Sequence, residues 1–134
     1  MSDSKAVLAA NNAFYRAFAR RDPAAMADLW SAAAPVTCIH PGWKPLYGRK
    51  SVMASWQRIL TNPDTPNIEV REPRAVVLDS TAFVICYEVM EQTVLVATNY
   101  FVRDGDGWKM VHHQATPTAL DPPRKKPAAT PTVH

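Results

Sequence analysis

The sequence predicts a single α+β domain in which three helices pack on a strongly curved antiparallel β-sheet. Apolar residues recur at helical spacing in three segments before residue 62, whereas residues 68–116 read as a series of apolar, β-branched runs. Asp104-Gly105-Asp106-Gly107 is a hairpin signal between the last two of these runs. The chain has 134 residues, 47% of them hydrophobic, which suits one domain with one core.

The first helix is expected over residues 4–21, where Val7, Asn11, Phe14 and Phe18 share one stripe. Asp22-Pro23 restarts a helix, because Asp is a good N-cap and Pro suits the first helical position. Gly48 opens the third helix, which residues 62–66 end.

Strands are expected where β-branched and apolar residues cluster. A short strand covers Val36–His40, and the Pro-rich residues 41–45 that follow must form a loop. Pro73 interrupts the first long strand and implies an edge position or a bulge there. The expected long strands cover residues 68–78, 82–93, 95–103 and 108–116.

The formal charge of +3 arises from the C-terminal end. Residues 1–116 carry 12 Lys+Arg against 11 Asp+Glu, and Arg124, Lys125 and Lys126 supply the surplus. We therefore expect no nucleic-acid partner. The domain is expected to end at residue 117, and the Pro-rich, basic residues 118–134 are expected to be a disordered tail.

No apolar run is long enough to span a bilayer, and the polar N-terminus does not resemble a signal peptide, so no membrane partner and a cytoplasmic location are expected. Cys38 and Cys86 are interpreted as buried thiols. We expect no metal, because His112 and His113 form the one closely spaced ligand pair, and their side chains diverge in a strand.

Several short motifs resemble the nuclear transport factor 2-like superfamily, which includes ketosteroid isomerase, SnoaL-like polyketide cyclases and scytalone dehydratase. The resemblance covers about residues 5–117 and implies a cone-shaped fold with a pocket. The last two strands are also similar to those of the calcium/calmodulin-dependent kinase II association domain. The motifs are Arg20-Arg21-Asp22-Pro23, Leu29-Trp30, His40-Pro41, Gly48–Val52, Thr98–Asp104 and Gly107–His113.

The resemblance carries over only in part to the functional residues. The catalytic Asp of the isomerases corresponds to His40, their helical oxyanion-binding Tyr to Phe14, and their second oxyanion donor to Asn99. Phe14 cannot donate a hydrogen bond. The two pocket arginines of the kinase domain correspond to Asn99 and Ala115. Steroid isomerisation in the form used by the family is therefore not expected.

Three residues are candidates for catalysis: His40 as a general base, and Asn99 and His112 as stabilisers of an oxyanion. For each of them the alternative is a buried polar group satisfied inside the protein. His112 is assigned inward because it alternates with Trp108 and Met110, which places His113 on the outer face.

Aromatic side chains are expected to line the cone or simply to fill the core, and Trp43 is expected to close over a ligand from its loop. Whether Glu88 or Tyr87 faces inward stays open, because the register is unknown. The residues expected to contact a ligand are Phe14, Phe18, Trp30, Trp43, Trp56 and Gln114.

Two functions follow from these expectations. The first is a small-molecule-binding domain that isomerises, dehydrates or cyclises a small apolar carbonyl compound by His-based proton transfer, without a cofactor. The second is a non-catalytic ligand-binding or oligomerisation module. In both cases a homodimer is expected through the convex face of the sheet.

Overall fold

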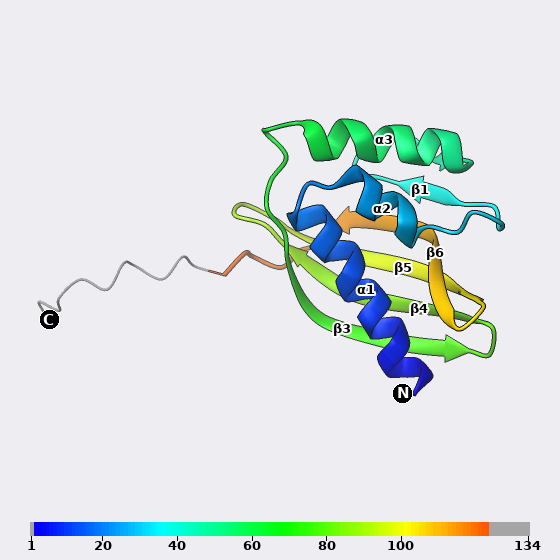
Figure 1. The fold of residues 1–134 in the computed structure, drawn as a ribbon. Helices are drawn as coiled ribbons and strands as arrows, with labels where there is room; N and C mark the ends of the chain where they lie inside the picture. Colours follow the sequence, from blue (N-terminus) through cyan, green and yellow to red (C-terminus); the bar gives the residue numbers. More distant parts are fainter. Residues whose placement is uncertain (1, 124–134) are drawn as a thin grey trace, which may run out of the picture.

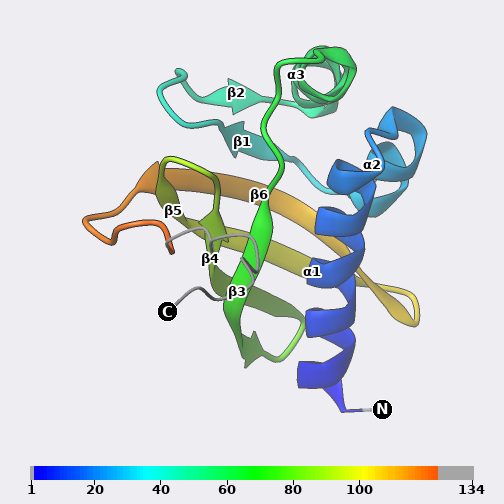
Figure 2. The ribbon, with the colours of Figure 1, turned by 90° about the vertical axis from the view of Figure 1, so that its left-hand side faces the viewer.

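A curved six-stranded sheet carries three helices in the computed structural model, which describes residues 2–123 (Figure 1). The strand order is β2-β1-β6-β5-β4-β3, and α1 packs across the sheet against β3, β4 and β6 (Figure 2). The helices are α1 (Asp3–Ala19), α2 (Pro23–Leu29) and α3 (Arg49–Thr61). The strands are β1 (Thr37–Ile39), β2 (Leu46–Tyr47), β3 (Glu69–Leu78), β4 (Thr81–Val89), β5 (Val94–Asp104) and β6 (Gly107–Pro117).

The helix starts follow the capping rules. Asp22 accepts a hydrogen bond from the Ala25 amide at 3.1 Å, and Pro23 occupies the first turn of α2, as predicted. The first helix ends two residues earlier than expected, because Arg21 adopts a left-handed conformation with φ of 55°. Its guanidinium then reaches the Thr65 carbonyl at 2.6 Å and secures the segment that follows α3.

The end of α2 is held by a side chain from α3. Arg49 donates hydrogen bonds to the carbonyls of Ala27, Trp30 and Ser31 at 2.9 to 3.0 Å. A helix end leaves carbonyl groups without intrahelical partners, and a guanidinium can satisfy several of them at once. Arg49 therefore fixes α2 against the start of α3.

The sheet is mixed rather than wholly antiparallel. The long strands β3 to β6 form the predicted antiparallel meander, but β1 pairs in parallel with β6. The chain returns to β1 from α2, so β1 enters beside β6 in the same direction, and the short β2 adds to its other edge. The expected antiparallel, curved sheet is thus confirmed for β3 to β6, and the parallel pairing of β1 makes the whole sheet mixed.

Two irregularities shape the long strands. The predicted break at Pro73 is confirmed, because the register shifts between Arg71 and Arg74 on β3, an edge strand. By contrast, β4 ends earlier than the predicted residue 93. The Met90 amide bonds to the Thr93 carbonyl at 2.9 Å and closes a turn.

A second register shift lies between β5 and β6, where Tyr100 pairs with His112 and Phe101 with Met110. Val111 is the extra residue of this β-bulge, and one extra residue reverses the facing of every residue beyond it. Trp108 and Met110 face inward as predicted, but beyond the bulge His113 and Ala115 are the buried residues. The predicted inward orientation of His112 and Gln114 is therefore wrong.

Thr118, directly after β6, stays attached to the sheet. Thr118 donates from both its amide and its hydroxyl to the Val94 carbonyl. Most of the tail that the sequence predicts to be disordered, residues 124–134, lies outside the described residues, so its disorder stays a prediction. Among residues 2–123, no helix has the length and apolarity needed to cross a membrane.

Candidate functional site

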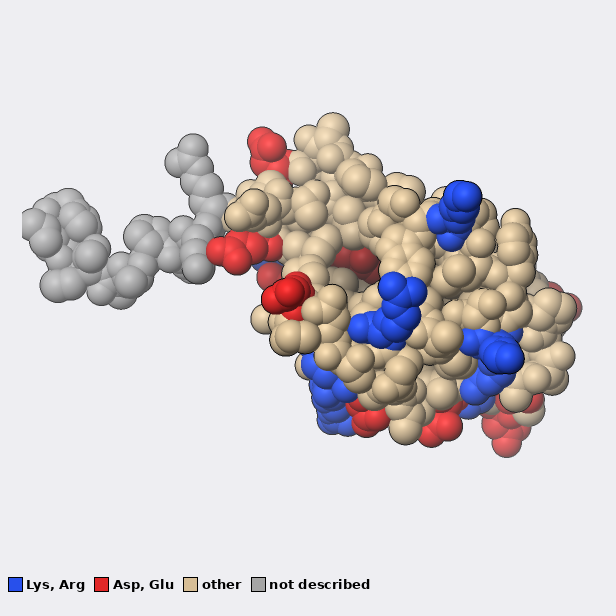
Figure 3. All heavy atoms as spheres, turned by 90° about the horizontal axis from the view of Figure 1, so that it is seen from above, with Lys and Arg blue, Asp and Glu red and all other residues tan. Residues whose placement is uncertain are grey.

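A cavity of about 450 Å³ lies between α1, α3, the end of β1 and the inner face of the sheet. Figure 3 shows this face of the molecule hollowed, with acidic atoms visible inside the hollow. Of the residues that the structure describes, Glu88 is the only acidic one that lines the cavity. Within residues 2–123, no Lys or Arg lines it. Its walls are mainly aromatic and aliphatic, which is typical of a small-molecule site.

Glu88 and Tyr15 form the polar centre of this cavity. Both side chains are buried, and the Tyr15 hydroxyl donates to Glu88 Oε2 at 2.6 Å. Burial raises the pKa of Glu88 to about 7, although the Tyr15 hydrogen bond opposes this shift. Burial, and then the neighbouring Glu88 charge, raise the Tyr15 pKa well above its usual value, so Tyr15 keeps its proton.

Asn99 connects this pair to His113. The Asn99 amide nitrogen donates to Asn11 Oδ1 at 2.8 Å and to the Tyr15 hydroxyl oxygen at 3.1 Å. The Asn99 oxygen therefore accepts, and its 2.6 Å partner, His113 Nδ1, must carry the proton. The opposite nitrogen, His113 Nε2, is left with a free lone pair, 3.9 Å from Glu88 Oε2.

Glu88 and His113 are not an ion pair at neutral pH. Burial, with smaller effects of His40 and His112, lowers the His113 pKa to about 3. The imidazole is therefore neutral, and 3.9 Å is too long for a direct hydrogen bond. The two groups stand close enough to contact the same ligand atom.

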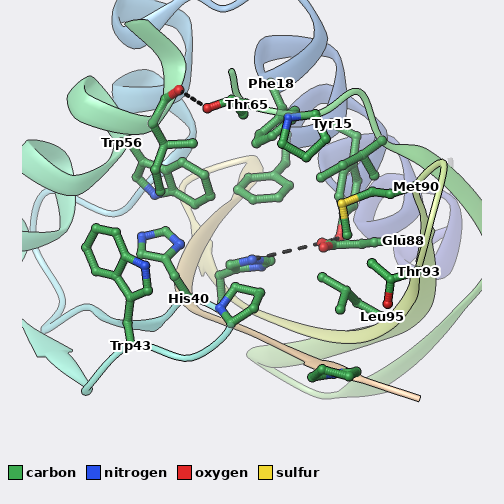
Figure 4. Close-up of a pocket in the computed structure, with 17 residues that line it drawn as sticks. Tyr15, Phe18, His40, Trp43, Trp56, Thr65, Glu88, Met90, Thr93 and Leu95 are labelled. Atoms are coloured by element: carbon green, nitrogen blue, oxygen red, sulfur yellow. Dashed lines mark hydrogen bonds and ion pairs between the residues drawn. The ribbon is translucent and has the colours of Figure 1, made fainter. Parts of the chain in front are cut away.

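His40 lines the cavity opposite Glu88, between Trp43 and Trp56 (Figure 4). Its ring centroid lies 4.8 Å from that of Trp43 and 4.7 Å from that of Trp56. The Ser55 hydroxyl donates to the Val52 carbonyl at 2.6 Å, so Ser55 Oγ accepts from His40 Nε2 at 2.8 Å. Burial lowers the His40 pKa to about 4, so this histidine is also neutral.

Five of the predicted site residues line the cavity: His40, Phe14, Phe18, Trp43 and Trp56. Four others do not. Asn99 is fully buried behind His113, and Trp30 is buried behind Trp56, with ring centroids 6.4 Å apart. His112 is directed to the other face of the sheet, where it bonds to Thr37 and Gln114. Neither His112 nor Gln114 therefore lines the cavity.

The sequence reasoning missed Tyr15 and His113 and left Glu88 undecided. Asn11 was one available signal, because an amide within the apolar stripe of a helix needs a buried partner. No comparable signal marked His113, because nothing in the local sequence indicates a bulge at Val111. The register between β4 and β5 pairs Glu88 with Leu95 and resolves the choice between Glu88 and Tyr87.

Within residues 2–123, no group of three or more His, Cys, Asp or Glu side chains is arranged to hold a metal ion. Cys38 and Cys86 are both buried free thiols. Burial, followed by the nearby Glu88, raises the Cys38 pKa to about 12. Cys38 is therefore a protonated thiol rather than a nucleophilic thiolate.

Solved structures with the same architecture include two relatives of moderate sequence identity. A proposed dehydratase of the NTF2-like family from Streptomyces avermitilis is 34% identical, with a TM-score of 0.80, and the match covers 88% of this chain and 97% of that one. A proposed calcium/calmodulin-dependent protein kinase type II association domain from Thiobacillus denitrificans is 32% identical, with a TM-score of 0.74, over 83% of this chain and 94% of that one.

A curated relative is the F-box protein SKIP8 from Arabidopsis thaliana, which is 28% identical over 120 residues. The match covers 88% of this chain but only 52% of that protein, so the chain spans about half its length. The model of the SnoaL-like domain matches residues 7–119, most of the chain. The chain therefore belongs to the SnoaL-like domain family, within the NTF2-like fold.

Proposed function

We propose that this chain is an acid–base catalyst that dehydrates or isomerises a small, largely apolar carbonyl compound without a cofactor. The observation that carries the proposal is Glu88, a carboxyl group whose pKa of about 7 matches neutral pH, inside an apolar cavity. General acid–base catalysis is most efficient when the pKa of the catalytic group lies near the working pH.

The base is assigned to Glu88 rather than to His40. With a pKa of about 4, His40 is the weaker base at neutral pH, and His113, with a pKa of about 3, is weaker still. Tyr15 holds the carboxyl group in place through its 2.6 Å hydrogen bond. The histidines then serve to accept hydrogen bonds from the substrate.

The Glu88 carboxylate would remove a proton from the carbon next to the substrate carbonyl, and the electron pair of that C–H bond would form an enolate. In a dehydration the enolate expels the β-hydroxyl group, which takes the proton from Glu88 and leaves as water. In an isomerisation Glu88 returns the proton to another carbon. Both sequences restore the Glu88 carboxylate. The name of the Streptomyces relative, a proposed dehydratase, favours the first.

The test is a panel of β-hydroxy ketones assayed for the rise in ultraviolet absorbance that accompanies formation of a conjugated enone. Glu88→Gln keeps the shape and the Tyr15 contact but removes the base, so turnover should fall at least about 100-fold. Glu69→Gln, at an exposed carboxylate on β3, is the matched control and should behave as the parent protein. Unchanged turnover in Glu88→Gln would refute the assignment.

A second candidate function, an oligomerisation module, is favoured by the outer face of the sheet. Val76, Leu78 and Ile85 are large apolar residues exposed there, and each is at least 42% accessible. A relative named as a proposed kinase association domain is 32% identical. Exposed apolar surface of this kind suits a second copy of the chain, which is compatible with a catalytic cavity on the opposite face.

A further inference from the structure

Most side-chain hydrogen-bond donors of the cavity are already used within the protein. Tyr15 donates its proton to Glu88, and Asn99 donates both of its protons to Asn11 and Tyr15. The Nδ1 proton of His113 goes to the Asn99 oxygen. The donors of Tyr15, Asn99 and His113 are therefore used within the network, whereas the Asn11 amide nitrogen, outside the cavity lining, has no hydrogen-bond partner in the part of the chain that the structure describes.

The other side of the cavity shows the same pattern. His40 donates from Nε2 to Ser55, and the Thr65 hydroxyl donates to the Ile59 carbonyl at 2.6 Å. Three donors of lining residues remain: the Trp43 indole and the Thr93 hydroxyl, which belong to exposed residues, and Trp56 Nε1, which is buried without a partner in residues 2–123. Among the described residues, Trp56 Nε1 is thus the one side-chain donor that lies deep in the cavity wall without a partner.

Acceptors are left free as well. His113 Nε2 keeps a lone pair, and His40 Nδ1 has only a weak contact with the Cys38 thiol, with 3.9 Å between Nδ1 and Sγ. The two ring centroids lie 6.3 Å apart on one side of the cavity. Glu88 adds carboxylate oxygens nearby. Among the described residues no cationic side chain lines the cavity, so a bound carboxylate or phosphate would find no compensating charge there and would face Glu88.

We propose that the cavity takes an uncharged, ring-containing compound through a hydroxyl group, which donates a hydrogen bond to the acceptors formed by His113, His40 and Glu88. The aromatic walls, among them Phe14 and Trp56, supply contact for the ring. This inference rests on the proposed function, since it describes the substrate class of the same site. It favours hydroxy-carbonyl compounds over compounds that lack a hydroxyl group and over carboxylates.

Three probes of similar shape separate these classes: 2-naphthol, 2-methoxynaphthalene and 2-naphthoate. Titration calorimetry at pH 8 keeps Glu88 ionised and the naphthol hydroxyl protonated. Naphthol should bind about 10-fold more tightly than the ether, the equivalent of one net hydrogen bond. Naphthoate should bind more weakly than both.

Two variants locate the effect. His113→Phe removes an acceptor while keeping a ring, so naphthol should lose its advantage over the ether. Glu88→Gln introduces an amide donor, so affinity for the ether should rise relative to naphthol. Because the Gln side chain retains the contact with Tyr15, this second variant gives a result even where His113→Phe fails to fold.

Equal affinity for naphthol and the ether, preference for naphthoate, or no binding of naphthol would each overturn the inference. None of the probes can be dehydrated, so binding and turnover are independent readouts. Selective binding of naphthol without turnover of any hydroxy ketone refutes the proposed function alone. Turnover without selectivity for the hydroxyl group refutes the ligand inference alone.

Discussion

Replacing Glu88 by Gln should stabilise the protein above neutral pH. The native state raises the Glu88 pKa from 4.5 to about 7, so between these values the native state holds a proton that the unfolded state has released. The stability of the parent protein is therefore reduced as the pH rises from 4.5 to 7, and stays reduced above 7. Gln cannot ionise, so the Glu88→Gln variant does not lose stability in this way as the pH rises.

The size of the effect follows from the shift. A difference of 7 − 4.5, about 2.5 pKa units, at about 1.4 kcal/mol per unit, corresponds to about 3 kcal/mol. Relative to its value below pH 4.5, the advantage of Glu88→Gln in unfolding free energy should therefore grow by about 3 kcal/mol by pH 8. Titrations of His40 and His113 occur in both proteins and cancel in the difference, provided the substitution leaves their environments unchanged.

Urea unfolding at pH 4, 5, 6, 7 and 8, followed by circular dichroism, measures this difference. Glu69→Gln serves as the control, because its exposed carboxylate, paired with Arg71, should give a nearly constant difference within about 0.5 kcal/mol. If the difference between the parent protein and Glu88→Gln does not change between pH 4 and 8, Glu88 ionises as readily in the cavity as in water. The acid–base proposal would then lose its basis.

Three further substitutions test other parts of the structure. Arg49→Ala should lower stability by about 2–4 kcal/mol in urea unfolding, because three carbonyl hydrogen bonds are lost, whereas Arg49→Lys should retain part of them. Asn99→Leu should cost at least about 3 kcal/mol by the same measurement, since it leaves His113 Nδ1 and other buried polar atoms unpaired, and a loss under 1 kcal/mol would argue against the network. Ile85→Lys on the outer face should convert a dimer into a monomer in sedimentation experiments, and a parent protein that sediments as a monomer would contradict the dimer prediction.

Much of the fold was predictable because the governing signals are local. Helical spacing, the Asp22-Pro23 start and the hairpin at residues 104–107 each depend on a few neighbouring residues, and all three appear in the structure. The parallel pairing of β1 with β6 was not predictable in this way. It depends on how α2 returns the chain to the sheet, which is a property of the assembled fold.

The candidate site was predicted less well than the fold. Strand alternation placed His112 inward and His113 outward, and the bulge at Val111 reversed both. Alternation predicts which face a residue occupies only while the register is continuous. A single inserted residue changes the register but leaves no mark in the pattern of apolar and polar residues. His40 was easier to place because it directly follows the short strand β1, in which no bulge changes the alternation of side chains.

The bulge also explains why the two cavity histidines lie on the same side. Beyond Val111, His112 pairs with Thr37 of β1, and its Nδ1 bonds to the Thr37 hydroxyl at 2.6 Å. His112, which the bulge turns outward, thus links β6 to β1, and β1 leads directly to His40 at the cavity. The next residue, His113, is turned inward by the same insertion, and the rings of His40 and His113 come to lie 6.3 Å apart. One extra residue in β6 therefore accounts for both the attachment of β1 and the acceptor pair that we assign to the ligand hydroxyl.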